Sequence, residues 1–202
     1  MFAPINGVNG SSWAGVKVFN TNIYDAALDG VYGDDVTDIE LGHCNIYNVN
    51  LLYNLNTNEN TSAGDGVQFA FTDSGGDHLR FHIHHTTIDR SSTGNKFCLI
   101  WGAGPNVRRS EALVEYNEFI INGNNETCIY TDTASQGNAT IRYNQFKGVG
   151  SGQGIHNRYV NTMLVHNNVF DTIGMPVENI AGSANIYNNT FVDCNYAYSL
   201  YA

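Results

Sequence analysis

Two carboxylates, Asp65 and Glu126, stand just before short apolar segments of similar composition. A pair of carboxyl groups can hydrolyse a glycosidic bond, with a separation of about 5–5.5 Å for retention or about 6.5–9.5 Å for inversion. Their places in the repeat described below put them two layers apart, on the order of 9–10 Å. A simpler interpretation stays open, in which Asp65 caps a turn and Glu126 forms a surface ion pair with Lys96.

A second group, Tyr130, His156 and Arg158, suits eliminative cleavage of a uronate-containing chain. That reaction needs a base to remove a proton and a cation to stabilise the resulting enolate. His156 and Arg158 are two apart on one predicted strand, so they should point the same way. An acidic protein would need Ca²⁺ or local basic residues to attract a polyuronate. The acidic residues between 34 and 38 are candidate calcium ligands without convincing spacing, and plain solvated surface residues are the alternative.

One segment is unusually rich in histidine. His82 and His84 flank Ile83, so on a strand both would point to the same face. Glu115 should stack above His84, and Glu40 below His82. Two imidazoles and a carboxylate could bind a transition metal, but residues two apart on a strand are separated by about 7 Å. We therefore interpret the segment as an exposed polar stripe and assign no metal ligands.

These residues must be positioned by a repeated element, which is the strongest signal in the sequence. Four segments align without gaps: A-L-V-E-Y-N-E-F at 112–119, A-T-I-R-Y-N-Q-F at 139–146, M-L-V-H-N-N-V-F at 163–170 and A-N-I-Y-N-N-T-F at 184–191. Three more fit upstream, at 16–23, 39–46 and 81–88. Apolar residues two apart, with variable residues between them, are typical of a strand with one buried face.

The columns of this repeat predict a solenoid. The last position is always large and apolar: Ile23, Ile46, Ile88, Phe119, Phe146, Phe170 and Phe191. Two residues earlier the column reads Thr21, Cys44, Thr86, Asn117, Asn144, Asn168 and Asn189. An asparagine recurring at a bend suits a left-handed corner, where its amide could bond to its neighbours above and below. A further short strand is expected at 66–71, 97–101, 127–131, 154–158, 176–180 and 196–200. We expect an all-β stack of about seven coils, about 34 Å long at roughly 4.8 Å per layer.

The pattern apolar-x-apolar-x-x-Asn-x-Phe/Ile resembles the right-handed parallel β-helix repeats of the pectate-lyase-like superfamily, over about residues 16–202. The resemblance implies that the asparagine corner joins the second and third sheets. It also implies a substrate groove on the outer face of the first sheet, as in polysaccharide lyases, polygalacturonase-like hydrolases and viral tailspikes. The substrate-binding candidates there are Gln68, Lys96, Asp132 and Glu178. The Asp65-Gly66-Val67 segment resembles the start of this strand in the hydrolases, but their paired aspartate and Gly-His-Gly turn are not matched. A sandwich or an up-and-down barrel is the rival fold.

We expect a single β-helix domain over 1–202, as a fragment of a longer chain, with an irregular lead-in at 1–15 and a long loop insertion at 47–65. The resemblance implies that a homo-oligomer, such as the trimer of tailspikes, or flanking domains cover the open ends. It also implies an extracellular protein, or one on a virion or cell surface, that acts on a polysaccharide as a lyase or hydrolase. The alternative is a non-catalytic structural, adhesive or carbohydrate-binding module. We expect no cofactor, with Ca²⁺ as the possible exception.

The amino-acid composition limits the kinds of partner that the protein could bind. The formal net charge is −10, and only 14% of the residues are charged, against roughly 25% in typical soluble domains. A protein that binds nucleic acid needs a basic stripe, so we expect no nucleic-acid partner. The apolar runs are too short for membrane insertion. Cys98 and Cys128 should stack in adjacent layers, where their Cα atoms come within disulfide range. Reduced, buried thiols are the favoured interpretation, and a disulfide is the alternative that stays open.

Overall fold

The computed structural model describes residues 8–11, 14–26, 28–49, 64–70, 79–90, 97–103, 108–123, 126–132 and 135–201. Its regular elements are strands in three parallel sheets, and the described residues contain no α-helix. They therefore include no helix of the length and hydrophobicity needed to cross a membrane. Residues 50–63 of the expected insertion, and Lys96, lie outside the described residues.

Each sheet takes one strand from every turn of the chain. The first sheet contains β1 (Val8–Ser11), β4 (Val31–Asp34), β7 (Val67–Ala70), β10 (Phe97–Ala103), β13 (Thr127–Thr131), β16 (Gln153–Asn157), β19 (Met175–Asn179) and β22 (Ser199–Leu200). The second contains β2 (Lys17–Phe19), β5 (Ile39–Gly42), β8 (Leu79–His84), β11 (Arg108–Glu115), β14 (Ser135–Arg142), β17 (Thr162–His166) and β20 (Ser183–Tyr187). The third contains β3 (Asn22–Tyr24), β6 (Asn45–Tyr47), β9 (Thr87–Asp89), β12 (Glu118–Ile120), β15 (Gln145–Lys147), β18 (Val169–Asp171) and β21 (Thr190–Val192).

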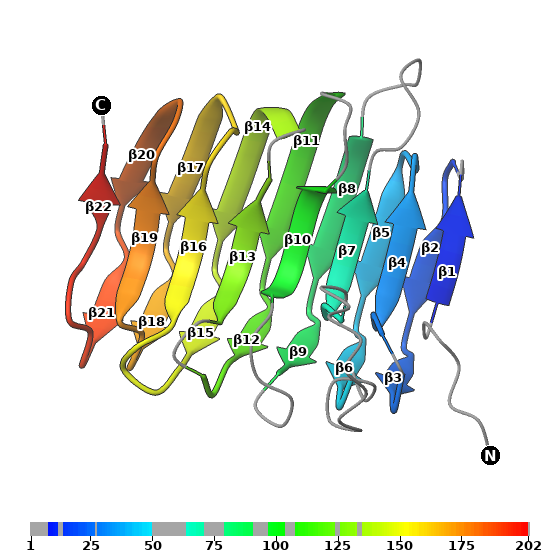
Figure 1. Cartoon of the computed structure of the whole chain (residues 1–202), viewed down its shortest axis with the longest axis horizontal. Helices are drawn as coiled ribbons and strands as arrows, with labels where there is room; N and C mark the ends of the chain where they lie inside the picture. Colours follow the sequence, from blue (N-terminus) through cyan, green and yellow to red (C-terminus); the bar gives the residue numbers. More distant parts are fainter. Residues whose placement is uncertain are drawn as a thin grey trace, which may run out of the picture.

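The chain winds through the three sheets in turn, which makes a right-handed parallel β-helix of seven coils (Figure 1). In Figure 1 the first sheet faces the viewer and the coils advance from the N-terminal end at the right to the C-terminal end at the left. The predicted fold is therefore confirmed. One detail differs: β1 lies within the expected lead-in, because Val8–Ser11 pairs in parallel with Val31–Asp34 of the next coil.

The predicted apolar column is continuous inside the helix. Ile23 lies over Ile46 and Ile46 over Ile88 in the third sheet, and Ile88 lies over Phe119. The phenylalanine rings then stack in order, with centroid separations of 5.1 Å, 4.5 Å and 5.4 Å between Phe119, Phe146, Phe170 and Phe191. Identical side chains stack because each coil repeats the backbone of the one before it in register. This column forms part of the hydrophobic core, which fills the space between the three sheets.

The asparagine ladder is also present, at the corner between the second and third sheets. The Oδ1 atom of Asn144 accepts hydrogen bonds from the backbone N–H of Asn117 at 2.9 Å and from its Nδ2 at 3.0 Å. The Nδ2 of Asn144 donates to the carbonyl oxygen of Val114 at 2.9 Å. Asn168 repeats the pattern one coil further on, and Thr86 and Cys44 continue the column upstream. The ladder thus satisfies backbone groups that the corner would otherwise leave buried and unpaired.

The left-handed residue at this corner is not the ladder asparagine, as we expected, but the residue before it. The residues there have φ between 49° and 57°: Asn20, His43, His85, Tyr116, Tyr143, Asn167 and Asn188. The ladder side chain must point inward, while the left-handed residue carries its side chain out to solvent. The corner therefore presents an exposed row of side chains at one-coil intervals, including His43, His85, Tyr116 and Tyr143.

All four cysteines are free thiols. Cys98 and Cys128 are fully buried in the core of adjacent coils, as expected for reduced, stacked side chains. Burial, reinforced by contact with Cys98, raises the pKa of the Cys128 thiol. The thiolate is the reactive form of cysteine, so a raised pKa makes the Cys128 thiol unreactive.

Candidate functional site

The outer face of the first sheet carries a column of polar and aromatic side chains. Tyr130 pairs with His156, and His156 pairs with Glu178, at successive coils. These residues are only partly buried, whereas their neighbours Ile129, Ile155 and Val177 point into the core. Alternation along each strand therefore places three of the predicted site residues in one line on the surface.

Tyr130 and Arg158 are joined directly. The Arg158 Nη1 donates a hydrogen bond to the Tyr130 hydroxyl at 2.7 Å, and this contact raises the pKa of Arg158. Phe97 stacks on the Tyr130 ring at a centroid separation of 4.4 Å, and His156 meets the Tyr130 ring edge-on at 5.1 Å. The structure therefore brings the three predicted elimination residues together, with the cation beside a phenol and an imidazole.

The tautomer of His156 follows from its partners. Its Nδ1 lies 3.0 Å from Gln153 Oε1 and 3.3 Å from Glu178 Oε2, which are both acceptors. Gln153 is oriented by Thr127, whose hydroxyl donates to the same Oε1, and by its own Nε2, which donates to Glu178 at 2.7 Å. The Nδ1 therefore carries the proton, and the lone pair of a neutral ring is on Nε2. That Nε2 is buried without a hydrogen-bond partner among the described residues.

The charge state of His156 allows this residue to act as a general base. Burial lowers the pKa of His156; the neighbouring Glu178 carboxylate opposes this shift and Arg158 reinforces it, and the net direction is downward. The imidazole is therefore neutral at neutral pH and can accept a proton at Nε2.

Asp65 and Glu126 do not form an exposed pair. Asp65 is 3% exposed and its Oδ1 accepts the backbone N–H of Phe97 at 3.1 Å. Glu126 is fully buried and its Oε2 accepts the backbone N–H of Asn122 at 2.7 Å. Extending the register of β7, β10 and β13 aligns Asp65 with Thr127, so the expected match with Glu126 is wrong by one residue. In a strand, a one-residue slip reverses the face of every side chain.

The remaining predicted substrate-binding residues differ in how close they lie to the cluster of Tyr130, His156 and Arg158. Gln68 lies in the outer column but is two strands from Tyr130, with Ile100 between them. Asp132 lies close enough to Arg158 to contribute to the upward shift of its pKa. Gln153 and Phe97 belong to the cluster although the sequence did not single them out. The signal available was that Gln153 precedes His156 by three residues on the same short strand, β16.

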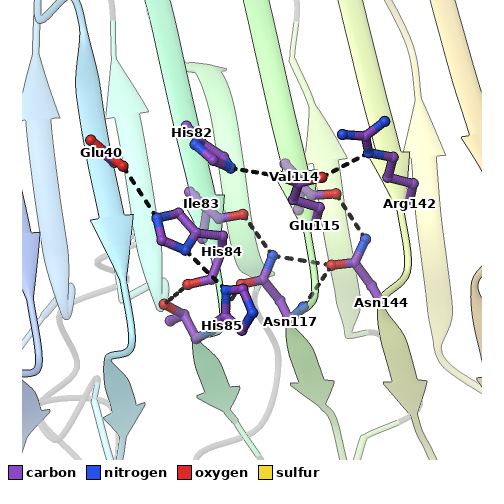
Figure 2. Close-up of polar contacts among 11 residues, drawn as sticks. Glu40, His82, Ile83, His84, His85, Val114, Glu115, Asn117, Arg142 and Asn144 are labelled. Carbon is purple, nitrogen blue, oxygen red and sulfur yellow. Dashed lines mark hydrogen bonds and ion pairs between the residues drawn. The ribbon is translucent and has the colours of Figure 1, made fainter.

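The second sheet carries a separate polar network (Figure 2). As expected, Glu115 pairs in register with His84 and Glu40 with His82. The side chains instead meet diagonally: His82 Nε2 lies 3.1 Å from Glu115 Oε1, and His84 Nε2 lies 3.3 Å from Glu40 Oε1. The expected ion pair between Glu115 and Arg142 is present at 2.7 Å. Burial acts to raise the pKa of Glu115, but the bonds from Arg142 and His82 outweigh it and lower that pKa.

Comparisons of this sequence and structure with protein-family models, curated proteins and solved structures gave no match. The fold alone therefore defines the class, which is the parallel β-helix proteins.

Proposed function

We propose that this chain is an extracellular, cell-surface or virion-surface β-helix that binds a polysaccharide along the outer face of its first sheet and cleaves it by elimination. The observation that carries the proposal is the contact of Arg158 with the Tyr130 hydroxyl, beside a neutral His156. The stacked rings of Phe97 and Tyr130 add a flat apolar surface of the kind that sugar rings pack against. The proposed relationship to the pectate-lyase-like superfamily is based on the repeated sequence pattern of the coils.

The proposed chemistry divides among three side chains. His156 Nε2 takes the proton next to the uronate carboxylate, and Arg158 stabilises the enolate that forms. The electron pair of the broken C–H bond then forms a double bond in the ring as the bond to the leaving oxygen breaks. The Tyr130 hydroxyl protonates that oxygen, and the proton that His156 took returns to Tyr130 through water, which restores both side chains. His156 Nε2 is buried, so a neighbouring side chain must turn aside when the substrate binds.

Hydrolysis by Asp65 and Glu126 is the weaker candidate. Both carboxylates are buried and each accepts a backbone N–H. A general acid or base must instead reach the scissile bond and the attacking water. This arrangement fits the role of turn caps.

A non-catalytic carbohydrate-binding module is the second candidate function. The buried Nε2 of His156 favours it, because the face can then present Phe97, Tyr130 and Arg158 to a glycan without any proton transfer. The net charge of −10 means that Ca²⁺ would assist the binding of a polyuronate in either case.

The test is incubation of the protein with a panel of polyuronates, with and without Ca²⁺, while ultraviolet absorbance reports unsaturated products and a colour assay reports reducing ends. We expect unsaturated products, with a loss of about 100-fold or more in Tyr130→Phe and Arg158→Ala. Tyr187→Phe, on the second sheet, is the matched control and should keep full activity. Reducing ends without unsaturation would indicate a hydrolase. Glycan binding that Arg158→Ala abolishes, without any cleavage, would support the non-catalytic module.

A further inference from the structure

Three histidines meet where the second sheet turns into the third, away from the face proposed to bind glycan. His84 ends β8, His85 forms the left-handed corner that follows it, and His43 forms the same corner one coil earlier. We propose that His43, His84 and His85 form a binding site for a divalent transition-metal ion such as Zn²⁺. The proposal is independent of the proposed polysaccharide function.

The distances fit one ion. The Nδ1 atoms of His84 and His85 are 3.1 Å apart (Figure 2). One ligand nitrogen from each of the three histidines can be chosen so that all lie within 4.8 Å of one another. Zinc binds imidazole nitrogen at about 2.0–2.1 Å in a tetrahedron, whose ligand atoms are then about 3.3–3.4 Å apart. The His84–His85 pair therefore needs only a small adjustment to share an ion.

The backbone of the corners sets this arrangement. His43 and His85 have φ of 54° and 49°, so both side chains project outward from equivalent corners. Their rings lie 4.7 Å apart and nearly parallel, at 17°. The His84 ring stands almost perpendicular to both, at 89° to His43 and 88° to His85. Two adjacent coils thus place three rings around one point.

Gly42 makes room for the third ring. It pairs with His84 across the sheet, and a Cβ at this position would lie 2.6 Å from His84 Cε1 and 2.7 Å from His84 Nε2. Only glycine therefore lets the His84 ring lie over β5. In that position the ring reaches both His43 and Glu40.

Glu40 provides the outer contact that metal-binding histidines usually have. Its Oε1 lies 3.3 Å from His84 Nε2, and its Oε2 accepts a hydrogen bond from Lys17 Nζ at 2.7 Å. A carboxylate on one ring nitrogen holds the proton there and leaves the lone pair on the other nitrogen for the metal. Glu40 therefore directs the Nδ1 of His84 toward His85, as Figure 2 shows.

A rival set, Glu40, His82 and His84, also brings its ligand atoms within 4.8 Å of one another. Two members of this rival set already contact other charged side chains. His82 Nε2 contacts Glu115 at 3.1 Å, and Glu40 is already bonded to Lys17. The three-imidazole set keeps these contacts, and the Nδ1 atoms of His84 and His85 already lie 3.1 Å apart. Neutral imidazoles also suit Zn²⁺, Ni²⁺ or Cu²⁺ rather than Ca²⁺ or Mg²⁺.

The test is calorimetric titration of the full chain with ZnCl₂, together with the visible absorption of the Co²⁺ form. We expect one ion per chain, bound with a micromolar or tighter dissociation constant, and a Co²⁺ spectrum typical of tetrahedral nitrogen ligands. His43→Asn and His85→Asn should each weaken binding at least tenfold. Asparagine is the matched replacement because Asn20, Asn167 and Asn188 occupy the same left-handed position in other coils. Glu40→Gln should weaken binding by about 10–100-fold.

Three further variants separate this site from its rivals. Tyr143→Asn changes the same corner two coils from His85 and should bind zinc like the unmodified chain. His82→Gln should also retain binding, whereas Gly42→Ala should weaken it by displacing the His84 ring while circular dichroism stays unchanged. Binding only at millimolar zinc would overturn the proposal. So would loss of binding in His82→Gln with His43→Asn and His85→Asn unaffected, because the ion would then occupy the rival set.

Discussion

His156 shows at the scale of one residue how the coil environment sets a charge. The ring lies between Tyr130 and Glu178 on adjacent strands, and its Nδ1 is held by Gln153. The pKa is lowered by burial and by Arg158, against the effect of Glu178. This position on the outer face of a strand therefore disfavours the protonated, imidazolium form of His156.

This lowered pKa predicts how stability depends on pH. In the unfolded chain His156 titrates near its ordinary value of about 6.5, so between that pH and its lower folded pKa the unfolded state binds more protons. The free energy of unfolding should therefore fall as the pH decreases below about 6.5. Urea midpoints at about pH 7.5 and about pH 5.5 measure the effect, and His156→Gln should reduce the difference between them.

The comparison needs a control because His166 contributes in the same direction. Burial, and secondarily Arg142, lower the pKa of His166. His156→Gln should therefore leave part of the pH dependence, and the double variant with His166→Gln should leave less. An unchanged difference between the two midpoints in His156→Gln would contradict the interpretation.

The corner between the second and third sheets is the element that fixes the register of the coils. Each left-handed non-glycine residue is unfavourable by itself, on the order of 1 kcal/mol. The ladder offsets this cost, because each asparagine bonds to backbone groups of an adjacent coil at both of its polar atoms. The corner is thus stable only as part of a stack.

The ladder leads to a stability prediction. Asn144→Ala leaves the backbone N–H of Asn117 and the carbonyl of Val114 without their partners. Each buried group left unpaired costs about 1–3 kcal/mol, so we expect a loss of about 2–5 kcal/mol in the free energy of unfolding. Asn138→Ala, at an exposed position of β14, should change it by less than about 0.5 kcal/mol. Chemical denaturation measures both, and equal losses would show that the ladder adds nothing specific.

At the scale of the whole molecule, every strand pairs only with strands of adjacent coils. Stability in such a stack is close to a sum of coil terms and nearest-neighbour terms. Burial follows the same logic: Ile141 and Phe146 in the middle have no exposed surface, whereas Ile186 and Phe191 of the seventh coil are partly exposed.

Hydrogen exchange should therefore show a gradient along this chain. Amides of β11, β14 and β17 have a coil on either side and should exchange slowest. Amides of β20, β21 and β22 should exchange fastest, because their side chains are half-buried or exposed. Exchange followed by mass spectrometry on peptic fragments measures this order. Uniform protection over all seven coils would mean that the chain opens only as one unit.

The fold could be predicted because every coil meets the same surroundings. Phe119, Phe146 and Phe170 face inward at the same point of each turn, so the repeat itself reveals the buried column. The first sheet was less predictable. The strands starting at Phe97 and Thr127 carry no marker of their facing, so the sequence alone aligns Glu126 with Asp65, one residue out of register.

By itself the sequence determined the period, the inward columns and the asparagine ladder, because all of these follow from strands stacked at a regular spacing. Only the tertiary structure decided which contacts the outward side chains make. Their directions depend on backbone angles and on the space left by neighbours: left-handed φ at His43 and His85, and the missing Cβ of Gly42, turn three histidines toward one point. The residue types in a repeat column reveal neither the backbone angles nor the space that neighbouring residues leave.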